Sequence, residues 1–309
     1  MSDAPRSIHA KAADFWLRLL FWLGREHPRL LAFGKRFFLA AAWTLARHTK
    51  QNLLLNAARL LGADSSGEDR QRLAKATLAN FYDFVCDIPR SAAMTPAQLL
   101  ARIKKVEGES AYREMRASGG GAIVLTAHMG SFEVGMAGLR QYEPKVHVLF
   151  RRDAQNLFEQ SRSELRARLG VGEAPVDEGL KIWMRLRDAL VANEVVCIQG
   201  DRVMSGQRGE PMHVLGGNIL LPTGPFKLAL LTGSPIVPIF STRLPDGGVN
   251  LFIETPIFVR TDSEVPTAMR GAAAVLERYL QQYPEQWLVL HRAWREDQQA
   301  GESDPPATA

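Results

Sequence analysis

The stretch "SGGGAIVLTAHMGSFEVGM" (residues 118–136) decides the fold class. A glycine-rich turn leads into the apolar run 122–126, whose β-branched Ile123 and Val124 predict a short buried strand. Ser131 is a suitable N-cap for a helix that begins at Phe132. Strand, turn and helix in this order build open α/β sheets, which bind ligands at the carboxyl ends of their strands. His128 is therefore expected at such an end.

His128 and Glu133 are the candidate proton-transfer residues. A neutral imidazole can take a proton from a hydroxyl and later return it. A carboxylate on the other ring nitrogen fixes the tautomer and stabilises the imidazolium. No G-x-S-x-G elbow supplies an enzyme nucleophile, so the attacking group would come from a substrate. We predict His128 as general base, oriented by Glu133; the alternative is a structural histidine at a strand end.

The spacing of a histidine five residues before an acid is weak evidence alone. It occurs three times, at His9, His128 and His291. Only His128 has the strand, turn and helix around it. His9 lies in a basic N-terminal segment, and His291 leads into a polar tail.

Composition indicates one large domain, or a domain with an appendage, because 309 residues with 46% apolar content can bury a sizeable core. Cys86 and Cys197 lie far apart in apolar surroundings and are expected to be free thiols in a reducing compartment. The chain has no CxxC or HExxH, no G-x-G-x-x-G and no Walker lysine, so we expect no metal, no cofactor and no nucleic-acid partner. The net charge of +5 suits an acidic partner or an anionic membrane surface.

The N-terminus favours membrane association. "FWLRLLFWLG" (15–24) and "RLLAFGKRFFLAAAWTLAR" (29–47) are rich in aromatic and aliphatic residues but are interrupted by Arg and Lys. Their longest uncharged stretch, 37–46, has ten residues and is too short to span a bilayer. Residues 1–90 are therefore expected to form a helical region lying in a membrane interface. The alternative is a helical hairpin packed on the protein's own core.

From about residue 91 the pattern alternates between strands and helices. Strands are expected at 122–126, 145–152, 194–201 and 236–243, with another in "GGVNLFIETPIFV" (247–259). A helix ahead of this region is expected to stop at Pro89. The alternation predicts an α/β core over 91–295, with a mixed, largely parallel central sheet flanked by helices. Residues 296–309 are expected to be a disordered polar tail.

Five ordered blocks carry a resemblance to a known family. The first is "GGGAIVLTAHMGSFEVG", which is similar to the H-x4-D/E block of the lysophospholipid acyltransferase superfamily. More narrowly, the chain resembles the bacterial lipid A late acyltransferases of the lauroyl/myristoyl type over residues 15–295. The other blocks are "VLFRRDAQNLF", "VVCIQGDR", "VLGGNILLPTGPFKLALLTGSPIVPIF" and "YPEQWLVLHRAW".

The resemblance implies acyl transfer without an acyl-enzyme. An acyl thioester, on acyl carrier protein or coenzyme A, would be attacked by a hydroxyl (or amine) of a membrane lipid acceptor. Such an enzyme would sit at the cytoplasmic face of the bacterial inner membrane, peripheral or monotopic. The segment "GEPMHVLGGNILLPTG" (209–224) departs from the family's usual pattern and leaves acceptors other than lipid A open. The rival functions are an ester or thioester hydrolase using the same His-Glu pair, and a non-catalytic membrane-binding relative.

The remaining blocks contribute candidate substrate-binding residues. The planar fork of Arg151 suits a phosphate or the charge that grows on a thioester oxygen. Asp201, after a buried strand, is expected to pair with Arg151 or Arg202 and hold the geometry. The backbone N–H groups of Thr223 and Gly224, before a helix, are suited to an anion. A surface ion pair, a helix or turn cap and a plain turn are the respective structural alternatives.

Overall fold

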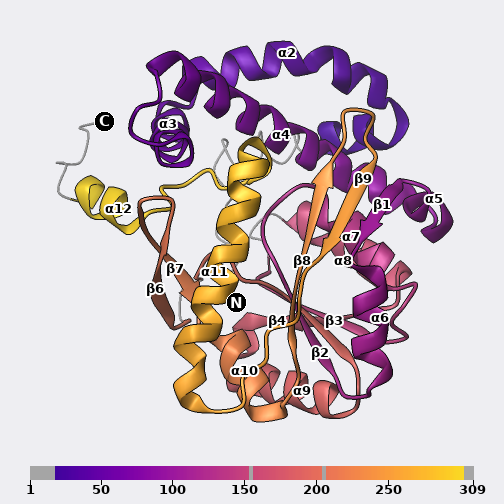
Figure 1. Cartoon of the computed structure of the whole chain (residues 1–309). Helices are drawn as coiled ribbons and strands as arrows, with labels where there is room; N and C mark the ends of the chain where they lie inside the picture. The colour runs from indigo at the N-terminus through magenta and orange to yellow at the C-terminus, as the bar shows by residue number, and fades with distance from the viewer. Residues whose placement is uncertain (1–17, 153–155, 204–206, 303–309) are drawn as a thin grey trace, which may run out of the picture.

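The computed structural model describes residues 18–152, 156–203 and 207–302, and its centre is a seven-stranded sheet (Figure 1). The spatial order is β1 (Ile103–Glu107), β9 (Val249–Ile253), β8 (Ile236–Arg243), β2 (Ala122–Thr126), β5 (Val195–Gln199), β3 (Val146–Phe150) and β4 (Val171–Pro175). Strands β8, β2, β5, β3 and β4 run parallel, and β9 is antiparallel to β8. The expected mixed, largely parallel sheet is confirmed.

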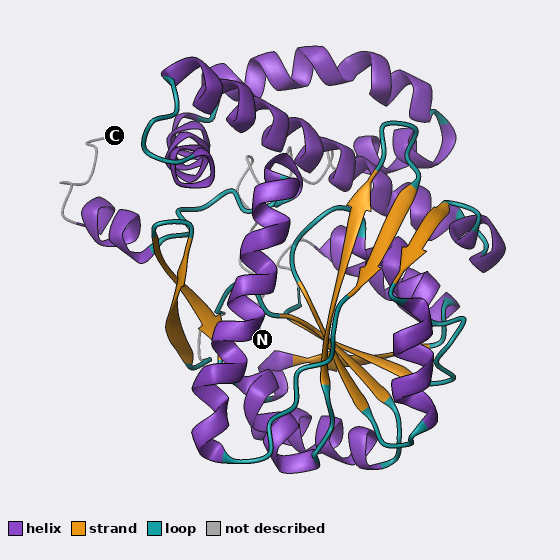
Figure 2. Cartoon of the chain, in the orientation of Figure 1, coloured by secondary structure: helices purple, strands orange, loops and turns teal. Residues whose placement is uncertain are grey.

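Helices cover both faces of the sheet, as Figure 2 shows. Along β2, Ile123 and Leu125 face one apolar cluster while Ala122 and Val124 face the other, which is typical of a strand buried on both sides. The first cluster is completed by α9 (Leu180–Val191), α10 (Gly224–Thr232) and α11 (Val265–Gln282). The second includes residues of α5 (Pro96–Leu100), α6 (Glu109–Ala117), α7 (Phe132–Leu139) and α8 (Asn156–Arg168).

The N-terminal part is helical, as expected, and packs across one end of the sheet (Figure 1). It contains a helical segment at 18–26, then α2 (Pro28–Leu45), α3 (Arg47–Leu61) and α4 (Gly67–Ala93). The prediction that α4 stops at Pro89 was wrong: the helix continues to Ala93, and Pro89 is buried against Gly24. Packing there offsets the backbone hydrogen bond that a proline removes.

Among the helices of the described residues, none is long and apolar enough to cross a bilayer.

The C-terminal half contains features that the sequence did not predict. Strands β6 (Gly209–Val214) and β7 (Gly217–Pro222) form a hairpin within 209–224, the segment that departs from the family pattern. Its turn is Leu215–Gly216, with φ of 48° and 73°, as a tight hairpin turn demands. Short 3₁₀ turns cover Val176–Glu178, Asp262–Glu264 and Pro284–Gln286.

The start of the predicted C-terminal tail also differs from the prediction. Residues 295–302 form helix α12 (Arg295–Glu302) instead of a disordered segment. Glu296 accepts hydrogen bonds from Asn218, and Asp297 forms an ion pair with Arg59, so side-chain contacts hold this polar helix in place. Residues 303–309 lie outside the described part of the chain, as do residues 1–17.

Candidate functional site

Strand register brings His128 and Asp201 together. Strands β2 and β5 are parallel neighbours with Thr126 opposite Gln199. His128 comes two residues after Thr126, and Asp201 comes two residues after Gln199. Both residues therefore lie next to each other at the same edge of the sheet. Gly200 N–H donates to the Thr126 carbonyl at 2.8 Å and continues the pairing beyond the strands. The result is a 2.7 Å contact between His128 Nδ1 and Asp201 Oδ1.

Asp201 is buried and held by three hydrogen bonds. Besides the ring contact, its Oδ2 accepts from the backbone N–H of His128 at 3.1 Å and from Trp287 Nε1 at 2.9 Å. Burial alone would raise the pKa of Asp201, but its interaction with the His128 ring and these hydrogen bonds outweigh it and hold the pKa well below its usual range. Asp201 is therefore an ionised acceptor with a fixed orientation.

The second ring nitrogen of His128 lies beside a cation. Arg202 Nη2 is 2.9 Å from His128 Nε2. A guanidinium can only donate, so Nε2 must accept and Nδ1 carries the proton donated to Asp201. This neutral tautomer leaves the Nε2 lone pair available once the exposed Arg202 side chain moves away, which is the protonation state that a general base needs.

A further histidine lies near this pair. Burial lowers the pKa of His291, and the positive charge of Arg202 lowers it further. A neutral His291 avoids a second positive charge beside Arg202.

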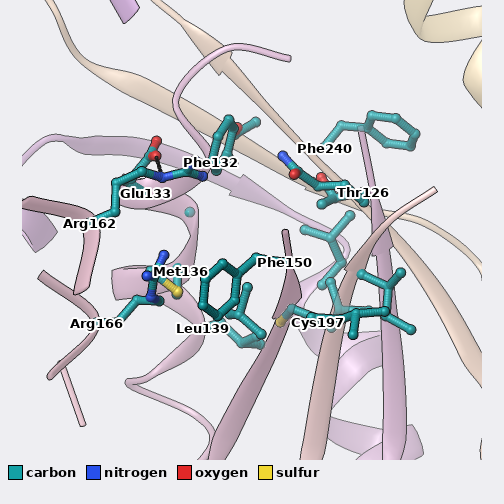
Figure 3. A pocket seen from close by; sticks show the side chains of 18 of the residues that line it. Thr126, Phe132, Glu133, Met136, Leu139, Phe150, Arg162, Arg166, Cys197 and Phe240 are labelled. Atoms are coloured by element: carbon teal, nitrogen blue, oxygen red, sulfur yellow. Dashed lines mark ion pairs between the residues drawn. The ribbon is translucent and has the colours of Figure 1, made fainter. Parts of the chain in front are cut away.

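Glu133, expected to orient His128, lies elsewhere. Its Oε1 is 3.4 Å from Arg162 Nε, and its side chain lines a cavity on the α7 side of the sheet (Figure 3). Burial raises the pKa of Glu133, and the charge of Arg162 offsets this only in part. The helix that begins at Phe132 packs over the sheet face, so its first turn directs Glu133 under the helix and not toward the strand end. The carboxylate on the ring is that of Asp201.

His128 opens into a groove with a strongly basic lining, called the basic groove below. Its cationic residues are Arg151, Arg152, Arg162, Arg202, Arg208 and Lys227, and of the described residues that line it the one with a carboxylate is Asp177. Such a lining favours anionic ligands. The expected site residues Arg151, Thr223 and Gly224 all line it.

Three of the expected contacts differ in detail. Asp201 bonds His128 and Trp287 where an arginine was expected. The backbone N–H of Thr223 donates to the Arg208 carbonyl at 3.1 Å, so it is already engaged. Gly224 lies against the Trp183 ring, where a Cβ atom would come within 2.6 Å of the ring. The Thr223 N–H is therefore not available to an anion, and the Gly224 α-carbon packs on Trp183 in the groove wall.

An apolar cavity adjoins the basic groove. It lies between the sheet and helices α7 and α8, and Phe132, Met136, Leu139 and Phe150 are among its lining side chains (Figure 3). The cavity is narrow: its own volume is about 90 Å³, and the larger space of about 800 Å³ includes open solvent at its mouth. Groove and cavity share the lining residues Leu149, Phe150, Arg162, Ile198 and Gln199. The two spaces therefore adjoin at these residues.

The other titratable groups offer no metal centre. Within residues 18–152, 156–203 and 207–302, no three His, Cys, Asp or Glu side chains gather closely enough to hold an ion. Both cysteines are free, and burial raises the pKa of the Cys197 thiol, in the cavity wall, to about 12.

Comparison with known proteins defines the class of this fold and site. The family model of the bacterial lipid A biosynthesis acyltransferases matches residues 2–296. The chain belongs to this family, so acyl transfer in lipid biosynthesis is the activity of its class.

The individual relatives share low sequence identity with the chain, but over long alignments. The chain is 25% identical over 281 residues to the phosphatidylinositol mannoside acyltransferase of Mycolicibacterium smegmatis, covering 89% of each protein. It is 24% identical over 303 residues to the protein of the same name from Mycobacterium tuberculosis, covering 95% of this chain and 92% of the relative. The lipid A biosynthesis lauroyltransferase of Escherichia coli is 23% identical over 218 residues, or 65% of this chain and 64% of that protein.

One feature of the sequence could have predicted the contact between His128 and Asp201. Both residues follow apolar strands by the same two positions, and adjacent parallel strands would place them together. The hydrogen bond from Trp287 had no such signal, because it depends on how the segment after α11 returns to the sheet edge.

The raised pKa of Glu133 predicts a pH-dependent stability. A carboxyl whose pKa is higher in the folded state binds more protons there, so its contribution to stability falls as pH rises above the unfolded value of roughly 4.3. Glu133→Gln removes this contribution. We expect the unfolding free energy of Glu133→Gln, minus that of the wild type, to increase between about pH 5 and pH 8 in urea titrations.

Glu210→Gln, at an exposed position on β6, is the matched control and should show no such trend. A Glu133→Gln difference that stays constant across this pH range would contradict the assignment.

Proposed function

We propose that the protein transfers an acyl group from a phosphopantetheine thioester, on coenzyme A or acyl carrier protein, to a hydroxyl of a membrane lipid. His128 is the general base. The observation that supports this most is the His128 ring itself: Nδ1 is fixed by buried Asp201, and Nε2 faces the basic groove. Asp201 takes the positioning role that the H-x4-E spacing suggested for Glu133.

The reaction follows from this tautomer. The acceptor hydroxyl replaces Arg202 at Nε2 and gives its proton to the ring, while Asp201 stabilises the imidazolium. The acceptor oxygen forms a bond to the thioester carbon. The C–S bond then breaks, and the leaving thiolate takes the proton from Nε2. No acyl-enzyme forms, because the attacking oxygen belongs to the substrate.

The groove and cavity suit the two parts of an acyl donor. The basic groove accommodates phosphates, and Arg151 or Arg202 can stabilise the charge that grows on the thioester oxygen. The apolar cavity accommodates the acyl chain, with the shared residue Phe150 at the junction. The thioester carbon would then lie near the strand ends, where His128 is.

A phosphorylated glycolipid is the acceptor that the relatives favour, since their names specify phosphatidylinositol mannoside and lipid A. The exposed surface of α2 is suited to binding the membrane that carries such a substrate. Phe33 and Phe37 are 64% and 57% exposed, and Arg36 lies over both rings at 5.0 and 4.6 Å. Exposed aromatics beside basic residues are typical of helices that bind an anionic interface.

We therefore assign 1–90 to a membrane-interface region and 91–295 to the catalytic core. The protein would act peripherally at the cytoplasmic face of the bacterial inner membrane.

The function is tested by comparing membrane lipids with and without the gene. We expect mass spectrometry to show loss of one acylated glycolipid on deletion and its return with the wild-type gene. With purified protein and that acceptor, His128→Ala should lower kcat by about 10²–10⁴-fold, because proton removal is no longer assisted.

His213→Ala, at an exposed position on β6, is the control and should retain wild-type activity. An unchanged lipid profile, or thioester loss that proceeds equally fast without acceptor, would contradict acyl transfer.

Membrane binding is tested on α2. Phe33→Ser with Phe37→Ser should weaken binding to vesicles containing anionic lipid by about tenfold, because two rings no longer enter the interface. Co-sedimentation measures this. The paired change of Leu180→Ser and Val191→Ser, exposed on α9, is the control. If both double variants lost vesicle binding equally, the result would contradict a membrane interface on α2.

A further inference from the structure

The apolar cavity contains buried polar atoms without hydrogen-bond partners. In the described residues, three buried side-chain nitrogen or oxygen atoms have none: Glu133 Oε1, Gln199 Nε2 and Arg243 Nη2. Glu133 and Gln199 both line the cavity. Arg162 lies 3.4 Å from Glu133 Oε1 as an ion pair, without the geometry of a hydrogen bond. Two unpaired hydrogen-bonding groups therefore belong to one largely apolar cavity, whose other polar lining residues include Thr126, Arg162, Arg166 and Ser241.

Leaving such groups unpaired is costly. A buried donor or acceptor without a partner costs about 1–3 kcal/mol, and native proteins contain few of them. A fully saturated acyl chain cannot satisfy either atom, and it would displace water that could. A cavity built only for methylene groups would not need a carboxylate and an amide in its wall.

The chemistry of the two atoms defines a complementary ligand group. Glu133 Oε1 accepts a hydrogen bond, and Gln199 Nε2 donates one. A hydroxyl can donate to the first and accept from the second. A keto oxygen can only accept, and a methylene can do neither.

Their position locates the group along the chain. Gln199 is the last residue of β5, two positions before Asp201, and it lines both the groove and the cavity. Arg162, the ion-pair partner of Glu133, also lines both. Gln199 is thus at the junction with the groove, where the thioester end of an acyl chain would lie, and Glu133 lies within the cavity beside Arg162.

Building on the proposed function, we infer that the acyl group carries a hydroxyl on carbon 2 or 3, recognised by Glu133 and Gln199. These two residues determine acyl specificity and do not take part in proton transfer. This gives the motif glutamate a role that does not require contact with His128.

The test is calorimetric binding to the full-length protein, which does not require the acceptor. The probes are dodecanoyl, tetradecanoyl and hexadecanoyl thioesters of coenzyme A and of pantetheine, each compared with its 2-hydroxy and 3-hydroxy forms. We expect one hydroxylated form to bind at least about fivefold more tightly than the saturated chain of equal length, equivalent to about one hydrogen bond. Gln199→Leu should remove this preference by weakening only hydroxyacyl binding, whereas Gln141→Leu, at an exposed position, should keep it.

The outcomes separate the two proposals. Binding of saturated and hydroxylated chains with equal affinity would overturn this inference and leave the acyl site intact. A Gln199→Leu effect of the same size on both chains would also overturn it, because the amide would then be merely structural. If no acyl thioester binds at all, the cavity is not an acyl site, and the proposed function fails as well.

Discussion

The hydrogen bond from His128 Nδ1 to Asp201 is the contact on which the site depends. It exists because two adjacent parallel strands end in register and each extends by two residues. Burial of Asp201 and its bond from Trp287 keep the carboxylate ionised and fixed. Nδ1 of His128 is thereby hydrogen-bonded within the protein, and Nε2 is directed to the basic groove. In the proposed mechanism, this arrangement is ready for proton removal before a substrate arrives.

The two carboxylates that were candidate partners of His128 lie in different environments. Asp201 receives hydrogen bonds that favour its charged form, so its pKa is lowered. Glu133 lies in an apolar wall, where burial raises its pKa. Opposite pKa shifts of these two acids indicate different tasks. We interpret Asp201 as the positioning residue for the base and Glu133 as part of the acyl-chain cavity. The basic groove and this cavity then divide the donor between its phosphates and its hydrocarbon.

Much of the fold was predictable because the central strands are short apolar runs, and β2 also follows a glycine-rich turn. Strand β8 was predicted with its observed bounds, and His128 was correctly placed at the end of β2. The edge strands β1 and β4 and the β6–β7 hairpin were missed, since their burial depends on tertiary partners. Within the site, spacing along the chain favoured Glu133 as the partner of His128. The observed partner is 73 residues away and is set by strand pairing, which local periodicity does not reveal.

The account is tested most directly by the protonation of the His128 ring, read from long-range ¹H–¹⁵N NMR of histidine-labelled protein. His128→Ala assigns the signals, and the pH is set so that the ring is neutral. The proton should be on Nδ1 in the wild type and in Glu133→Gln. Asp201→Asn should shift it to Nε2, because the amide can donate to Nδ1. A wild-type proton on Nε2, or a tautomer that responds to Glu133→Gln and not to Asp201→Asn, would contradict the account.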